Sequence, residues 1–168
     1  MFITDIANNS DIFIDTNIFL YCISDHPRYS KSCTKFLNKI DRGRINGFTS
    51  ITVLNELLHK LVLAEIADKQ GLKLLDVINL IKKTPDILKD LEVYEIIERV
   101  ETLDNLVIYN INTEHFIIAR KFMKQYGLLS NDALHVAVMK THGIENIASN
   151  DLDFERVRWV KLYKPSKI

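Results

Sequence analysis

Four acidic residues stand where the sequence predicts that strands end or helices begin; they are Asp15, Glu56, Asp132 and Asp151. Asp15 directly follows the apolar run 12–14, and Asp151 comes soon after a similar run at 146–149. Glu56 and Asp132 lie in the first two turns of predicted helices. The carboxyl ends of parallel strands and the amino ends of the following helices share one edge of an α/β sheet, so we expect the carboxylates to meet there.

Such a cluster of carboxylates has an electrostatic cost that a bound cation would relieve. Two carboxylates about 6 Å apart repel each other by roughly 3 kcal/mol at an effective dielectric constant near 20. Four acids form six pairs, so keeping all of them ionised costs on the order of 10 kcal/mol or more. Oxygen ligands without cysteine or histidine favour a hard cation, Mg²⁺ or Mn²⁺, over zinc. Such an ion can activate water and neutralise the charge that develops on a phosphodiester.

Each acid alone also has an ordinary structural explanation. Asp132 in a first helical turn stabilises the helix dipole, and Glu56 alone is more typical of a solvated helix face. Asp151 and Asp153 resemble turn-forming residues. Asp15 is the hardest to explain in this way, because apolar sequence flanks it on both sides. The conjunction of these acids, rather than any one of them, therefore indicates a site.

Other catalytic arrangements find no support in the sequence. It contains no G-x-S-x-G motif, no cysteine paired with a histidine by a known spacing and no glycine-rich phosphate-binding loop. Its five histidines are scattered, and we interpret them as surface or helix-packing residues. His135, one turn after Asp132, is the only histidine near the proposed site.

Alternating strand and helix patterns predict the elements that position the acids. They favour a three-layer α/β/α sandwich with a central, mostly parallel sheet and an extra helical lobe, in a single domain over 1–168. Strands are predicted at 12–14, 46–49, 106–109, 146–149 and 158–162. Helices are predicted at 15–24, at 27–41, from a cap at Thr49 or Ser50 through Leu61, twice within a helical insertion at about 67–103, at 112–127 and at 130–143. Thr84-Pro85-Asp86 is expected to open the second helix of the insertion, and Ser130 to cap the last helix.

Composition limits the class of protein. The chain has 168 residues, 47% of them hydrophobic, which is typical of a well-packed globular protein and not of a disordered one. The 22 Lys and Arg residues balance 22 Asp and Glu residues, so the protein as a whole does not attract nucleic acid. Two cysteines without metal-binding spacing, no secretion signal and no apolar run of membrane length predict a cytoplasmic protein that enters no membrane.

Basic residues gather on one face of the helix predicted at 27–41 and just beyond it; they are Lys31, Lys35, Lys39, Arg42 and Arg44. A solvated helix face is the commoner explanation of such a pattern. Because this basic stripe is the densest in the chain, it is also the best candidate for contacting the phosphates of a nucleic acid.

Four segments resemble the motifs of the PIN domain family, and in particular the VapC-type toxin ribonucleases of VapBC toxin–antitoxin pairs. The segments are Phe13-Ile14-Asp15-Thr16-Asn17, the stretch 49–57 from Thr49 to Leu57, Ser130-Asn131-Asp132-Ala133-Leu134-His135, and the stretch 148–154 from Ala148 to Phe154. They occur in the order found in the family and span almost the whole chain. Each motif is weak by itself, and the four in order are a strong signal.

The resemblance implies a Mg²⁺- or Mn²⁺-dependent endoribonuclease in which in-line attack of an activated water leaves a 5′-phosphate. It assigns the catalytic metal site to the four acids and supporting contacts to four neighbours, namely Thr16, Asn17, Ser149 and Asp153. Asp151 is preferred to Asp153 as the fourth ligand, because it directly follows the strand and Ser149-Asn150. The implied partners are an RNA substrate and a cognate antitoxin protein, with a homodimer as a further possibility.

Several alternatives remain open at this point. The insertion at 67–103 is longer than compact toxins of the family usually carry, so a nuclease of RNA processing or decay is a second interpretation. A catalytically silent PIN scaffold that binds RNA or protein is a third, although such a scaffold is expected to lose acids. A receiver-like signalling module is disfavoured, because Tyr109-Asn110 occupies the end of the third strand where a receiver needs its phospho-acceptor.

Overall fold

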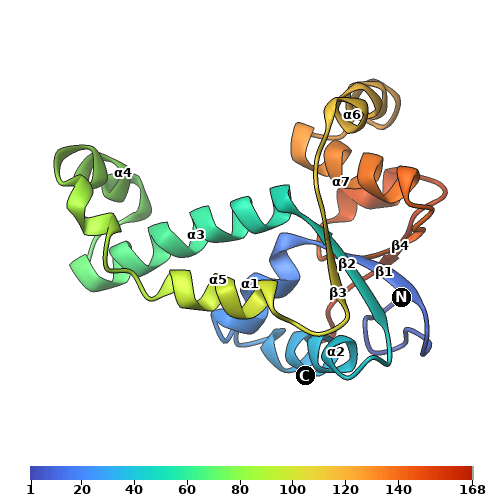
Figure 1. Ribbon diagram of the computed structural model, residues 1–168, viewed down its shortest axis with the longest axis horizontal. Helices are drawn as coiled ribbons and strands as arrows, with labels where there is room; N and C mark the ends of the chain where they lie inside the picture. The colour runs from blue at the N-terminus through green and yellow to red at the C-terminus, as the bar shows by residue number, and fades with distance from the viewer. Residues whose placement is uncertain (168) are drawn as a thin grey trace.

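A single parallel sheet forms the centre of the computed structural model, which describes residues 1–167 (Figure 1). Its five strands lie in the order β3-β2-β1-β4-β5, and every neighbouring pair runs parallel. The strands are β1 (Asp11–Ile14), β2 (Asn46–Ser50), β3 (Leu106–Tyr109), β4 (Asn146–Ala148) and β5 (Lys161–Tyr163).

The central strand β1 is the most deeply buried element of the sheet. Ile12, Phe13 and Ile14 have no exposed surface, as expected for a β-branched and aromatic run that is covered on both faces. Phe13 pairs with Phe48 of β2 on one side and with Ile147 of β4 on the other. The chain therefore leaves β1 in the middle of the carboxyl edge of the sheet, where β2 and β3 lie on one side and β4 and β5 on the other.

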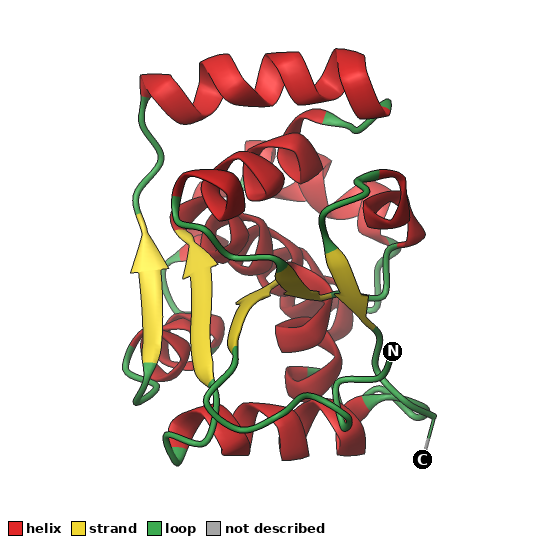
Figure 2. Ribbon diagram, turned by 90° about the vertical axis from the view of Figure 1, so that its right-hand side faces the viewer, coloured by secondary structure: helices red, strands yellow, loops and turns green. Residues whose placement is uncertain are grey.

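Helices cover both faces of the sheet (Figures 1 and 2). α6 and α7 pack on each other on one face, and α1, α2, α3 and α5 form the layer on the other face. The α-helices are α1 (Thr16–Ile23), α2 (Ser30–Asp41), α3 (Ile51–Gln70), α4 (Leu74–Lys83), α5 (Val93–Glu101), α6 (Thr113–Tyr126) and α7 (Ser130–Thr141), and the 3₁₀-helices are η1 (Pro85–Leu88) and η2 (Leu152–Arg156).

The helical lobe is built on the far half of α3. This helix has 20 residues, so it is about 30 Å long and extends well beyond the sheet. α4 and η1 pack at its far end (Figure 1). Glu65 of α3 fixes the return of the chain, because its carboxylate accepts hydrogen bonds from the backbone N–H groups of Glu92 and Val93, each 2.9 Å long. α5 then leads back to the sheet.

Most of the predicted architecture is confirmed, including the three layers and the helical lobe. The sheet is parallel throughout, and the last strand begins at Lys161 rather than at 158. Thr84-Pro85-Asp86 opens only the short 3₁₀-helix η1, and α5 begins later, at Val93. Ser130 is the first residue of α7 and not its cap, since Leu129 holds the cap position. Within residues 1–167, no helix combines the length and apolar character needed to cross a membrane.

Gly47 allows α2 to pack closely on the sheet. A Cβ atom at this position would lie 2.7 Å from Cγ2 of Ile40 and 3.3 Å from Cδ1 of Ile14. A Cβ atom is essentially never found 2.7 Å from another carbon, so any side chain here requires Ile40 or the whole of α2 to shift. The close contact explains why a residue of low strand propensity occupies an inner strand.

Gly47→Ala is therefore expected to lower the free energy of unfolding by about 1–3 kcal/mol, measured by urea denaturation. The combined variant Gly47→Ala/Ile40→Ala should lose less than the sum of the two single variants, because the second substitution removes the atom that the new methyl group meets. Strictly additive losses would contradict this account of the contact.

Candidate acidic site

Asp15 lies at the centre of the site, where β1 ends and α1 begins. Its backbone N–H still pairs with Ala148 of β4 at 3.0 Å, while its side chain caps α1. The carboxylate accepts hydrogen bonds from the Thr16 N–H at 2.7 Å, from the Ser149 hydroxyl at 2.6 Å and from the side-chain amide of Asn17. The Asp15 side chain is thus almost completely enclosed and held in one orientation.

The segment after β4 is tied to the same network. The Asn17 side-chain oxygen accepts the Asn150 N–H at 3.0 Å, and Ser149 Oγ accepts the Asp151 N–H at 3.0 Å. These bonds place Asp151 beside the start of α1, although the two segments are more than 130 positions apart. Thr16 and Asn17 on one side and Ser149 on the other thus lie where supporting residues are predicted.

Glu56 and Asp132 reach the site from the helices on opposite faces of the sheet. Glu56 lies in the second turn of α3 and is paired with Lys60 at 2.6 Å. Asp132 lies in the first turn of α7. Partial burial, together with the negative charges of the neighbouring acids, raises the pKa of Asp132 to about 7. The acids that contribute, in order of effect, are Asp15, Asp151, Asp153 and Glu56.

The carboxylates thus influence each other as the sequence predicts, but their environments differ. Burial raises the pKa of Asp15, and the charge of Glu56 adds to this, against the lowering effects of His135, Ser149 and Thr16. Glu56 behaves in the opposite way: burial opposes ionisation, but the hydrogen bond and charge of Lys60 lower the pKa of its carboxyl group. The pKa of Asp15 is thus also raised, and Asp132, with a pKa of about 7, is partly protonated near neutrality when no cation is bound.

His135 lies at the site, as its position one turn after Asp132 indicated, although it was interpreted as a surface or helix-packing residue. It is 1% exposed, and its Nε2 lies 3.9 Å from Oδ1 of Asp15. Neither ring nitrogen has a hydrogen-bond partner among residues 1–167, and burial lowers the pKa, so the imidazole is neutral. Its spacing of three residues from Asp132 on one helical face was the available signal.

The carboxylate oxygens of the site are ligands that suit a hard divalent cation. The side chains are not, however, in the positions that would coordinate one ion. In the described part of the chain, no group of three carboxylate, histidine or cysteine side chains is placed to hold one ion. The Thr16 hydroxyl is buried without a hydrogen bond of ordinary geometry within 1–167, and it lies near the Glu56 carboxyl group, whose pKa it helps to lower. This buried oxygen and the raised pKa of Asp132 both fit a site that a cation would stabilise.

The basic stripe lies apart from the acids. Arg42 and Arg44 follow α2 and precede β2, at the amino ends of the strands, which is the edge opposite the carboxylates. Lys31 and Lys35 are exposed on α2, and Lys39 donates a hydrogen bond of 3.3 Å to the Thr4 carbonyl. The structure does not bring this stripe together with the acidic site.

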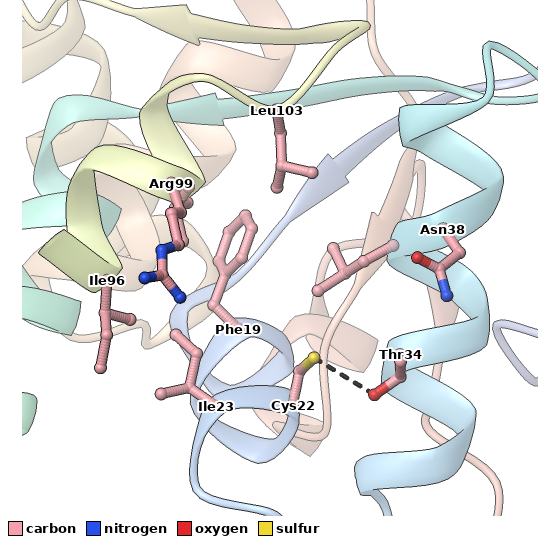
Figure 3. Close-up of a pocket in the computed structure, with 10 residues that line it drawn as sticks. Phe19, Cys22, Ile23, Thr34, Asn38, Ile96, Arg99 and Leu103 are labelled. Carbon is pink, nitrogen blue, oxygen red and sulfur yellow. Dashed lines mark hydrogen bonds between the residues drawn. The ribbon is translucent and has the colours of Figure 1, made fainter.

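An apolar cavity of about 300 Å³ also lies outside the site, between α1, α2 and α5 (Figure 3). Phe19, Cys22 and Ile23 line it from α1. Cys22 and Thr34 interact across its wall at 3.2 Å. The cavity holds no acidic side chain, so it takes no part in the chemistry of the carboxylates.

The raised pKa of Asp132 predicts how stability depends on pH. Without a cation, the folded protein retains a proton that the unfolded chain releases, so the free energy of unfolding falls as pH rises from the ordinary pKa of 3.8 to about 7. Asp132→Asn removes this loss and should raise Tm by about 2–4 °C near pH 8 and by less near pH 5. Thermal unfolding in chelator measures both values, and equal shifts at the two pH values would contradict the assignment.

Comparisons with known proteins agree with this architecture. The sequence model of the PIN domain matches residues 12–160. Ribonuclease VapC2 of Methanocaldococcus jannaschii is 32% identical over 154 residues, which cover 90% of this chain and 91% of the relative. Ribonuclease VapC6 of the same organism is 28% identical over 163 residues, which cover 92% and 97%.

Solved structures share the fold at lower identity. VapBC2 from Rickettsia felis, bound to a DNA fragment from its promoter, has a TM-score of 0.59 at 18% identity, over 93% of this chain and 99% of that one. VapC20 from Mycobacterium tuberculosis, a toxin that cleaves the sarcin–ricin loop, has a TM-score of 0.57 at 17% identity, over 87% and 94%. From the family match and the related sequences together, the chain belongs to the PIN domain family.

Proposed function

We propose that this protein is a metal-dependent endoribonuclease that hydrolyses RNA phosphodiester bonds at its acidic site. The observation that carries the proposal is the position of the acids at the carboxyl edge of the sheet, where the Ser149 hydroxyl donates to the Asp15 carboxylate and accepts the Asp151 N–H. The raised pKa of Asp132, to which Asp15, Asp151 and Glu56 contribute, agrees with this position. Its relatives named Ribonuclease VapC2 and VapC6 support RNA as the substrate. The whole chain acts as one domain in this proposal, because α3 belongs to both the site and the helical lobe.

The four acids would hold Mg²⁺ or Mn²⁺ through their carboxylate oxygens. When bound, the cation would supply charge neutralisation and lower the pKa of a water. Asp15 is fixed by Ser149 and Asn17, so it gives the site a carboxylate of constant orientation. Asp132 would hold the cation as a carboxylate, because a nearby positive charge favours its ionised form. Asp151 would present its carboxylate from the segment after β4, where this group caps η2 by accepting the Asp153 N–H at 2.9 Å, while the Asp153 carboxylate is paired with Arg156.

A toxin role within a toxin–antitoxin pair is the biological setting that we propose. The fold neighbours include VapBC2 and a toxin–antitoxin complex from Klebsiella pneumoniae, which has a TM-score of 0.58 at 16% identity and covers 94% of this chain. An antitoxin protein is thus the proposed partner. Growth arrest on expression of this chain alone, relieved by co-expression of an adjacent short gene, tests this role. Unimpaired growth despite active nuclease would favour RNA processing or decay.

Removal of one carboxylate should abolish cleavage while leaving the fold intact. Asp132→Asn is expected to lower the rate of Mg²⁺- or Mn²⁺-dependent RNA cleavage to below about one-hundredth, since charge stabilisation of this kind is worth on the order of 3 kcal/mol. Gel analysis of a labelled RNA gives the rate, and circular dichroism checks the fold. Asp76→Asn on the exposed start of α4 is the matched control and should cleave normally. If Asp132→Asn cleaves RNA at the rate of the parent protein, the acidic site is not the catalytic site.

We further propose that the basic stripe contacts parts of a long RNA distant from the cleaved bond. Lys35→Glu/Lys39→Glu should weaken binding of a long RNA and reduce the salt dependence of binding, by about one unit of slope for each lost phosphate contact. A short oligonucleotide that reaches only the acids should bind unchanged. Lys82→Glu/Lys83→Glu in the helical lobe is the charge-matched control. Unchanged salt dependence for the long RNA would identify the stripe as a solvated face.

A further inference from the structure

An open pocket of about 450 Å³ adjoins the acidic site. It is lined by Asn17 and Tyr21 of α1 and by Asn150, Asp151 and Leu152 of the segment after β4. Its size falls within the range of roughly 300–1,000 Å³ that is typical of small-ligand pockets. Asp151 belongs to both the pocket and the acidic site, so a group bound in the pocket lies directly beside the carboxylates.

Hydrogen bonds hold the polar wall of this pocket in place. Asn17 connects the Asp15 carboxylate to the backbone N–H of Asn150, and the Asn150 side-chain amide donates to the Tyr21 hydroxyl at 3.1 Å. This chain of bonds leads from the acidic site to an aromatic side chain. The bonds within 1–167 leave the hydroxyl proton of Tyr21 and Oδ1 of Asn150 free, so the wall offers one donor and one acceptor.

Aromatic packing fixes Tyr21 from the other side. Its ring centroid lies 4.6 Å from that of His26 and 5.1 Å from that of Tyr29, and these two rings stack on each other at 4.9 Å. All three residues are half-buried, so the cluster is accessible and yet supported. Leu152, which is 56% exposed, adds an apolar surface to the pocket. A preformed flat surface of this kind needs little ordering when a planar ligand stacks on it.

The lining also excludes one class of ligand. It contains no lysine or arginine, and Asp151 contributes a carboxylate. A phosphate group is therefore disfavoured in the pocket itself, whereas a neutral planar ring with hydrogen-bonding edges suits it. Every nucleobase has such a ring, and bases of single-stranded RNA are commonly bound by stacking on aromatic side chains with contacts to their edges.

We propose that this pocket binds an unpaired nucleobase of the RNA substrate, adjacent to the phosphodiester that is cleaved. The base stacks against Tyr21 and Leu152, and its edge contacts Asn150 Oδ1 and the Tyr21 hydroxyl. The inference rests on the proposed ribonuclease function and restricts it to RNA with an unpaired nucleotide beside the cleaved bond. Stacking accepts any base, so the pocket selects strandedness more strongly than sequence.

Binding of a short fluorescent single-stranded RNA, measured by anisotropy with Mn²⁺, tests the pocket directly. Asp132→Asn serves as the background in every variant, because it prevents cleavage during the measurement. In that background, Tyr21→Ala is expected to weaken binding about tenfold and Leu152→Ser severalfold, as for loss of one stacked base. Tyr21→Phe keeps the ring and should stay within about threefold. Tyr94→Ala, on an exposed tyrosine of α5, is the matched control and should bind normally.

An abasic nucleotide placed at each position in turn gives the sharper test. At the position next to the cleaved bond, loss of the base should weaken binding to the Asp132→Asn protein. The loss should be about as large as the one that Tyr21→Ala causes with intact RNA. The Tyr21→Ala variant should bind this abasic RNA and the intact RNA equally well, because the substitution and the missing base remove the same contact. Abasic positions elsewhere should give losses that add to that of Tyr21→Ala.

The outcomes separate the pocket from the function on which it rests. Normal RNA cleavage by the parent protein, with additive losses at every abasic position, overturns the pocket and leaves the ribonuclease function intact. Absence of RNA cleavage by the parent protein overturns both. If circular dichroism shows that Tyr21→Ala does not fold, the Leu152→Ser variant and the abasic series test the pocket instead. Leu152 is exposed, so its substitution does not disturb the core.

Discussion

Repulsion between carboxylates gathered at one sheet edge is the constraint around which this molecule is built. The fold offsets it locally in different ways. Hydrogen-bond donors surround Asp15, Lys60 neutralises Glu56, and Asp132 holds a proton when no cation is present. A site in which each acid is stabilised differently can bring negative charge together without unfolding, and the proposed cation would take the place of the proton.

The arrangement of acids was predictable from sequence because it depends on local rules. An acid after a buried strand and an acid in the first turns of a helix are each recognisable, and a parallel sheet places such positions on one edge. Asp15 and Asp132 were found in this way. The positions of the strands along the chain also follow from alternating patterns, and the bounds of β1 and β3 differ little from those predicted. The order of the strands within the sheet was not predicted.

What sequence reasoning missed depends on contacts between distant segments. The role of His135 is visible only once Asp15 lies 3.9 Å away, and the Tyr21–Asn150 bond joins positions 129 residues apart. For the basic stripe, the sequence correctly groups the residues on and just after one helix. Only the direction of α2 in the fold reveals that they lie at the sheet edge opposite the acids. Thr84-Pro85-Asp86 is a local signal that tertiary packing reduced to a 3₁₀ turn.

The bond from Ser149 to Asp15 spans 134 positions of the chain and has a consequence for synthesis on the ribosome. β1 and Glu56 emerge early, but Asp15 lacks its hydroxyl partner and the acids Asp132 and Asp151 until α7 and β4 have also emerged and docked. A growing chain therefore carries an incomplete set of carboxylates through most of its synthesis. A nuclease built in this way is inert throughout most of its own translation and becomes competent only when its last strands close the sheet.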